Sequence, residues 1–109
     1  MTSIENFHAH IYFDPHEIEA ARSLAGEAAA RCAASVGRFH ERPVGPHPRG
    51  SCQLTVAPER FGDFASWAAV NRRGLTIFAH PSTGDERADH VDHVVWFGPS
   101  EALDLSVLD

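Results

Sequence analysis

The stretch F-H-A-H-I-Y-F alternates apolar and polar side chains, and this alternation restricts the fold more than any other feature of the chain. Successive side chains of a β-strand point to opposite faces of the sheet. The apolar side chains of the stretch therefore share one face: Phe7, Ala9, Ile11 and Phe13. The polar ones share the other: His8, His10 and Tyr12. The sequence thus predicts a sheet with one buried face and a second face that bears imidazole and phenol groups.

A helix signal follows this strand directly. In D-P-H-E, Asp14 is suited to the N-cap position, Pro15 to the first helical position, and Glu17 completes a capping box. Small apolar side chains then recur at helical spacing, and Gly37 is placed to end the helix. We predict a helix over about residues 15–36, with a narrow, alanine-rich face that lies close on the sheet.

The remaining elements complete a β-α-β-β-α-β order, which is typical of a ferredoxin-like α+β fold. In this fold an antiparallel sheet has strand order 4-1-3-2, and two helices cover one face and leave the other open. A further strand and a C-terminal segment are expected to cover part of the open face or to pair with a second subunit. The predicted ranges are a strand over 38–42, an irregular loop over 43–50, a strand over 51–56, a helix over 59–72, a strand over 75–79, a strand over 93–97 and the segment 102–108.

Length and composition favour one domain over residues 1–109, since 43% of the residues are hydrophobic. The formal net charge of −6 argues against nucleic acid and anionic membranes as partners. No apolar stretch is long enough to span a membrane, and the N-terminus lacks a signal-peptide pattern, so we expect a cytoplasmic protein. Cys32 and Cys52 lie in apolar patterns and are predicted to be reduced core thiols.

Four histidines are expected to converge on the open face. In the predicted topology the first strand begins beside the end of the fourth, which brings His80 toward His8 and His10. The loop that holds His47 enters the third strand near Tyr12. Same-face positions lie about 6.6 to 6.8 Å apart along a strand, so their imidazoles can share one metal. An isolated H-x-H pair is more often surface decoration, but convergence of several histidines favours catalytic zinc or non-haem iron(II).

Other candidate residues surround this face. His90 belongs to the segment 80–93, which we predict to be a turn-rich loop with solvated carboxylates; there it can act as a general acid or base above the site. Gln53 and Phe78 stand on the open face, and Phe78 can form an aromatic wall with Trp96 or belong to an interface. Arg49 can pair with a substrate carboxylate or be an ordinary surface arginine.

Three motifs in order along the chain resemble those of the DOPA 4,5-dioxygenase family, over about residues 7–98. They are H-A-H-I-Y-F, G-P-H-P, and F-A-H-P-S-T-G-D followed by A-D-H and V-V-W-F-G. The resemblance implies a ferredoxin-like α+β fold and an extradiol ring-cleaving dioxygenase, of which fungal members cleave L-DOPA. It places the histidines of the family at His8, His10, His47, His80 and His90.

The implied reaction inserts both atoms of O2 into a catechol at a divalent metal, which we expect to be Fe(II), with Zn(II) or another divalent metal in purified protein. Such a metal keeps two or three positions open, so it needs few protein ligands. We expect ligands from His8, His10, His47 and His80, with His90 as the acid–base group. The substrate-binding candidates are Tyr12, Arg49, Gln53 and Phe78. A carboxylate of Glu5, Glu41 or Asp85 can join the ligands, but none falls on the open face, which favours three histidines.

Two other function classes remain open at this point. The chain can be a dimeric ferredoxin-like module that binds a metal or small ligand without catalysis, or a cofactor-free enzyme that acts on an aromatic substrate. Whichever function holds, a homodimer is expected, because Phe78 and Trp96 make the open face apolar and because edge strands invite pairing.

Overall fold

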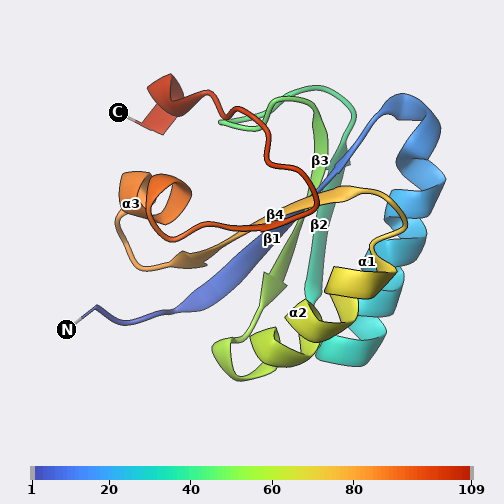
Figure 1. Ribbon diagram of the computed structural model, residues 1–109, viewed down its shortest axis with the longest axis horizontal. Coiled ribbons are helices and arrows are strands. Elements are labelled where there is room, and N and C mark those ends of the chain that lie inside the picture. Colours follow the sequence, from blue (N-terminus) through green and yellow to red (C-terminus); the bar gives the residue numbers. More distant parts are fainter. Residues whose placement is uncertain (1, 109) are drawn as a thin grey trace.

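The computed structural model describes residues 2–108; the two ends of the predicted domain, residues 1 and 109, lie outside the described part. Its centre is one antiparallel sheet with strand order β2-β3-β1-β4-β5 (Figure 1). The strands are β1 (Asn6–Phe13), β2 (Ser35–His40), β3 (Gly50–Val56), β4 (Thr76–Ser82) and β5 (Val95–Phe97). The predicted α+β, ferredoxin-like class and the order 4-1-3-2 are confirmed, and β5 extends the sheet beside β4.

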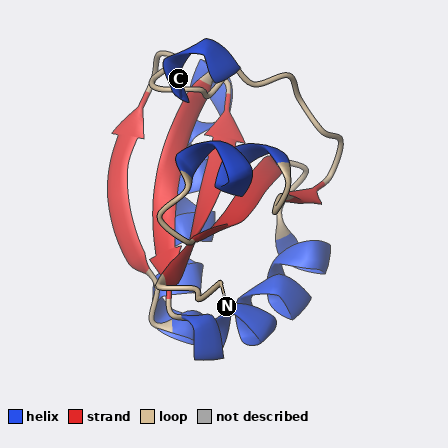
Figure 2. Cartoon of the chain, turned by 90° about the vertical axis from the view of Figure 1, so that its left-hand side faces the viewer, coloured by secondary structure: helices blue, strands red, loops and turns tan. Residues whose placement is uncertain are grey.

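Helices lie on both sides of this sheet. The helices α1 (Ile18–Cys32) and α2 (Pro58–Asn71) pack on one face, while α3 (Glu86–Val91) and the short 3₁₀ helix η2 (Leu105–Leu108) lie on the opposite side (Figures 1 and 2). The C-terminal segment therefore covers part of the open face, as expected, whereas β5 extends the edge of the sheet. No helix among residues 2–108 is long and apolar enough to cross a bilayer.

The first helix begins where the sequence predicts and ends earlier. The Asp14 N–H donates to the Glu17 side chain at 2.9 Å, and the capping box starts a 3₁₀ turn, η1 (Pro15–Glu17), that leads into α1. The prediction that the helix continues to residue 36 was wrong, because Ala33 adopts a left-handed conformation with φ of 54°. The chain then enters β2, where ladder hydrogen bonds with β3 replace helical ones.

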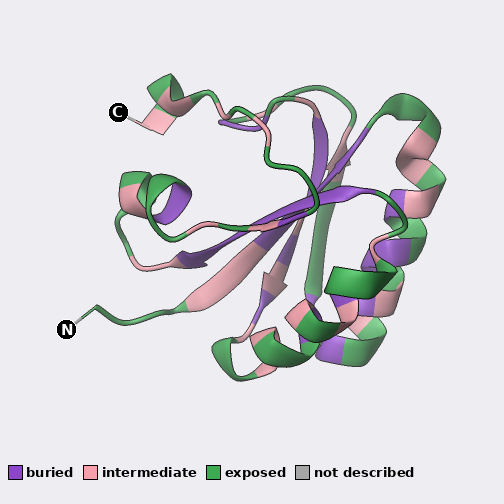
Figure 3. Ribbon diagram, viewed as in Figure 1, coloured by how far each residue is buried: buried purple, intermediate pink, exposed green. Residues whose placement is uncertain are grey.

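The hydrophobic core lies between the sheet and the two long helices. As the alternation predicts, the apolar side chains of β1 from Ala9 onward are buried against the alanine-rich face of α1 (Figure 3). Burying each large apolar side chain contributes about 1.5–3 kcal/mol. Cys32 and Cys52 are buried free thiols, as predicted, and burial raises the pKa of the Cys52 thiol to about 11. The core therefore needs no cross-link.

The segment 80–93 differs most from its prediction as a loop. Its start belongs to β4, and α3 forms within it because the Asp85 carboxylate caps the helix by accepting from the Ala88 N–H at 3.0 Å. This helix and the C-terminal segment cover Phe78, which is fully buried rather than solvated. The apolar open face is therefore covered within one chain. It no longer supports a homodimer, which leaves the edge strands as the reason to expect one.

Candidate active site

Three histidines converge on the open face at the junction of β1 and β4. The strand register places His8 directly opposite His80, and His10 follows two residues later on the same face. The Nε2 atoms of His10 and His80 are 3.2 Å apart, and one ring nitrogen from each of the three histidines lies within 4.8 Å of the others. For metal–nitrogen distances of about 2.1 Å, neighbouring ligands stand about 3.0 to 3.4 Å apart in octahedral or tetrahedral geometry. We call His8, His10 and His80 the histidine triad.

The protonation of the triad suits a metal. The His80 Nδ1 lies 2.8 Å from the Pro81 carbonyl oxygen; since a carbonyl only accepts, Nδ1 donates and the Nε2 lone pair faces His10. Burial lowers the pKa of His80 to about 4, holds that of His10 well below its usual value, and lowers that of His8. At neutral pH all three rings are therefore neutral, which is the form that binds a metal.

No carboxylate joins this group among residues 2–108: their cluster of potential metal ligands consists of the triad alone. Asp85 is engaged in capping α3, and Glu5 and Glu41 are exposed outside the group. The donor set thus fits a three-histidine site with open coordination positions, the arrangement that catalytic zinc and iron centres use.

Metal-free protein is expected to lose stability as the pH falls from about 6.5 toward about 4. Burial lowers the pKa values of His47 and His80 in the folded chain to about 4, whereas the unfolded chain protonates its histidines near the ordinary value. In that window the unfolded state binds more protons, so the free energy of unfolding decreases as protons are added. Urea denaturation of chelator-treated protein at about pH 7 and about pH 5 measures this. An unchanged or higher midpoint at the lower pH would contradict it.

His47 lies beside the triad rather than within it. Its Nδ1 is 2.7 Å from the Tyr12 hydroxyl, and its ring centroid is 4.0 Å from that of His10. Tyr12 is fully buried, and burial raises its pKa above the usual range, so it remains a neutral phenol. The loop therefore meets the first strand at Tyr12 as predicted, and this hydrogen bond holds the His47 ring against His10.

His90 reaches the triad from α3. Its Nδ1 lies 2.7 Å from the Glu86 carbonyl oxygen one turn earlier, so Nδ1 donates and Nε2 keeps its lone pair. The ring centroid is 4.1 Å from that of His80 and 5.9 Å from that of Phe78. The sequence predicted that His90 belongs to a loop above the site, whereas in the structure the helix α3 orients it.

Asp89 is a residue that the sequence analysis missed, because it reads as one more solvated carboxylate. It is only 2% exposed, and it accepts hydrogen bonds from the Thr83 N–H at 2.8 Å and the Thr83 hydroxyl at 2.6 Å. These bonds tie α3 to the end of β4, and the next residue along the helix is His90. The only sign of this contact in the sequence is that Thr83 and Asp89 lie close together along the chain, one before and one after the N-cap residue of α3.

Replacing Asp89 with alanine is expected to destabilise the protein by about 1–3 kcal/mol, because the Thr83 N–H then loses its partner. Turnover should fall as well, since α3 no longer holds His90 in place. Thermal denaturation and steady-state kinetics measure the two effects, and Asp89→Asn, which keeps an acceptor oxygen, should recover part of both. Asp92→Ala, an exposed change at the end of the same helix, serves as the control. A variant at Asp89 that behaved like this control would contradict the role.

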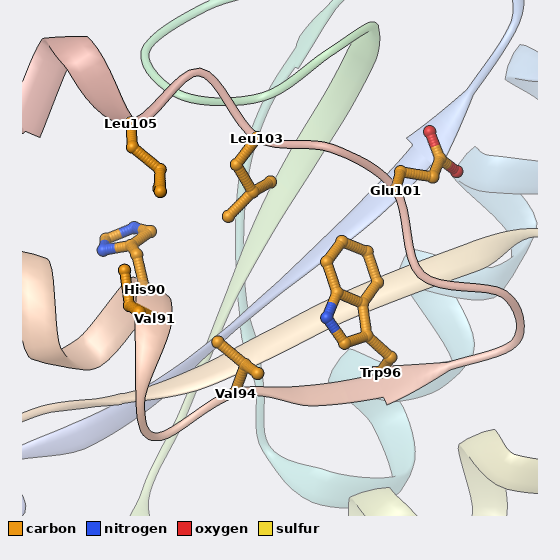
Figure 4. A pocket seen from close by; sticks show the side chains of 7 residues that line it. All are labelled: His90, Val91, Val94, Trp96, Glu101, Leu103 and Leu105. Carbon is orange, nitrogen blue, oxygen red and sulfur yellow. The ribbon is translucent and has the colours of Figure 1, made fainter.

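A cavity of about 230 Å³, here called the His90 cavity, opens beside His90 (Figure 4). Its walls are mostly apolar and come from α3, β5 and the C-terminal segment: His90, Val91, Val94, Trp96, Glu101, Leu103 and Leu105. The Glu101 carboxylate points away from the other side chains of the cavity. Phe78 lies beneath, with its ring 4.6 Å from that of Trp96. Such walls suit an aromatic ring, but no sequence pattern marked Leu103 or Leu105.

Arg49 is held by carboxylates of its own chain. It donates to Glu101 at 2.8 and 3.0 Å and to Asp14 at 3.2 Å, and Glu17 lies 3.5 Å away. The hydrogen bond to Glu101 is the main reason that the pKa of Arg49 is raised further. A substrate carboxylate would have to compete with these partners. The predicted role of Arg49 in substrate binding stays a prediction.

Gln53 lines a second cavity of about 100 Å³, here called the small cavity, on the β2–β3 side of the site. Its amide donates to the Thr55 hydroxyl at 3.2 Å. The small cavity shares His10 with the triad, and all of its lining residues except Val44 carry a polar or charged group: His10, Arg38, His40, Val44, His47, Ser51 and Gln53.

Comparison with known proteins agrees with the geometry. A sequence profile of the Dopa 4,5-dioxygenase family matches residues 7–107. The DOPA 4,5-dioxygenase of Amanita muscaria is 35% identical over 98% of this chain and 51% of its own length. An uncharacterized 21.2 kDa protein of Botryotinia fuckeliana is 38% identical over 65% of this chain and 43% of its own length. The chain thus spans about half the length of these curated relatives.

The crystal structure of a candidate dioxygenase from Nostoc punctiforme PCC 73102 superimposes with a TM-score of 0.93. It is 38% identical to this chain and covers 96% of it, and the match covers 91% of the Nostoc chain. The family profile covers both the β1 histidines and α3, so it spans every element that builds the site. The chain belongs to the Dopa 4,5-dioxygenase family.

Proposed function

We propose that this chain is an extradiol ring-cleaving dioxygenase that inserts both atoms of O2 into a catechol. The histidine triad holds a divalent metal, and His90 is the acid–base group. The observation that carries the proposal is the approach of the His10 and His80 Nε2 atoms to 3.2 Å. The His90 imidazole and an apolar cavity lie beside this pair. A protein that only stores metal would need the triad but neither His90 nor the His90 cavity.

Iron(II) is the proposed metal, and when bound it supplies the redox-active centre that brings catechol and O2 together. Zn(II) or another divalent ion can occupy the same three nitrogens in purified protein. The neutral rings of the triad, two of them buried and that of His8 half-buried, are ready to bind without first losing a proton.

His90 acts on protons through Nε2, because Nδ1 is committed to the Glu86 carbonyl. This nitrogen accepts a proton from a catechol hydroxyl and returns it later in the reaction. The apolar walls of the His90 cavity orient the ring and keep water away from it. Trp96 is the aromatic part of that wall and packs on the buried Phe78. Tyr12 positions His47 against the triad.

The test is oxygen uptake by protein purified without air and reconstituted with Fe(II). We expect metal at about one ion per chain, and a screen of catechols should give yellow ring-cleavage products with one O2 consumed for each catechol. Metal binding without oxygen uptake on any catechol would favour the non-catalytic metal-binding module. Turnover of an aromatic substrate by fully chelated protein would favour the cofactor-free enzyme.

Three further parts of the proposal concern the protein as a whole. A cytoplasmic location and a small-molecule substrate without nucleic acid remain our expectation, in keeping with the net charge of −6. A homodimer also remains a prediction, and it now depends on the edge strands β2 and β5, since the apolar open face is covered within one chain.

A further inference from the structure

A β-bulge in β2 alters the wall of the small cavity. Val36 pairs with Leu54 and Phe39 with Cys52, so β2 advances three residues while β3 advances two. A bulge of this kind re-aims a side chain and is common beside active sites. Gly37 permits it, because a Cβ there would lie 3.1 Å from the Gln53 carbonyl oxygen. The residue that follows this glycine, Arg38, lines the small cavity.

Arg38 carries a charge that the fold does not neutralise. Among residues 2–108, no carboxylate lies within ion-pair distance of its guanidinium, in contrast to Arg49, which has three. Ser51, on the same wall, is only 2% exposed, and its hydroxyl has no hydrogen-bond partner in the described part of the chain. A cation and an unpartnered hydroxyl therefore face one cavity, which is suited to an anion.

The size and place of the small cavity indicate what enters it. At about 100 Å³ it has less than half the volume of the cavity beside His90, about 230 Å³, so it fits a substituent rather than the aromatic ring. It shares His10 with the triad, and His47 closes it on the side of Tyr12. A molecule that lies at the triad can therefore extend a substituent into this cavity.

We infer that Arg38, Ser51 and Gln53 form an anion subsite that receives a carboxylate on the side chain of the catechol, and that Arg38 determines specificity. This inference rests on the proposed function. The guanidinium offers a planar pair of N–H donors that matches a carboxylate, and the Ser51 hydroxyl and Gln53 amide can donate to the remaining lone pairs. Arg38 then takes the role that the sequence suggested for Arg49.

The experiment compares two ligands that differ in the anionic group, 3,4-dihydroxyphenylacetate and 4-methylcatechol. Calorimetry on metal-loaded protein without O2 measures binding and does not depend on turnover. The wild type should bind the carboxylate about 10- to 100-fold more tightly, as expected for charge-assisted hydrogen bonds. Arg38→Gln should remove this preference, and Arg38→Lys should restore part of it. Arg42→Gln, the same charge change at an exposed position outside the cavity wall, should leave it intact.

The outcomes separate the subsite from the reaction. Absence of a preference in the wild type, or a preference that survives Arg38→Gln, overturns the subsite whether or not O2 is consumed. Inorganic phosphate that bound as tightly as the dihydroxyphenylacetate would indicate a site for free anions and would also overturn it. A preference that Arg38→Gln abolishes supports the subsite, and if the wild type then consumes no O2 with either catechol, only the proposed reaction fails.

Discussion

Replacing His10 with alanine is expected to abolish metal binding and activity while the fold survives. The His10 Nε2 is one of the two nitrogens that stand 3.2 Å apart, and two remaining histidines cannot hold the ion alone. Loss of a ligand should weaken metal affinity by more than about 100-fold, because mutation of residues that only orient the ligands already lowers the affinity by about 10- to 100-fold. His10 lies on the face opposite the hydrophobic core, so circular dichroism should remain that of the wild type.

Metal content after dialysis is the direct measurement, and His80→Ala should behave in the same way. His16→Ala is the matched control, because this histidine is exposed on the turn before α1. Full metal occupancy in both His10→Ala and His80→Ala would show that the triad is not the ligand set. His47, which lies against His10, would then become the first ligand to test.

Replacing His90 with glutamine is expected to leave the metal in place and slow turnover by about 10²- to 10⁴-fold, the usual cost of losing a general acid–base group. The centroid of the His90 ring is 4.1 Å from that of His80. His90 does not belong to the triad, whose ring nitrogens lie within 4.8 Å of one another. Both kcat and kcat/KM should fall, because the proton is transferred in the transition state and matters little to ground-state binding. The limb of the pH–rate profile that reports the base should disappear in the variant.

The control for this variant is His93→Gln, an exposed histidine just beyond the same helix. Wild-type turnover by His90→Gln would remove the acid–base role from His90. A variant that lost its metal together with its activity would instead identify His90 as a ligand, and His8 or His47 would then become the acid–base candidate.

Much of the fold could be predicted because its signals are local. The alternation in β1 defines two faces within seven residues, and the capping box at Asp14 starts a helix whatever surrounds it. The order of elements then leaves few topologies, and the observed order β2-β3-β1-β4 is the predicted one. Predictions failed where local signals are weak. The end of α1 depends on the β2–β3 ladder, and α3 is too short for its periodicity to be read.

The sequence by itself determined which chemistry the open face carries, because side-chain alternation places His8, His10 and Tyr12 there whatever the rest of the chain does. Only the tertiary structure decided how these groups are arranged. The register of β1 with β4 sets His80 against His8, and the loop before β3 brings His47 into a hydrogen bond with Tyr12.

The charges around the site were also decided by contacts between distant segments. Arg49 and Arg38 look alike in the sequence, yet the first is neutralised by acidic residues from both ends of the chain and the second is left free by a bulge in β2. Asp89 is buried because Thr83 supplies two donors across the helix cap. Ion pairing and burial depend on which segments meet in space, and no local pattern of residues encodes that.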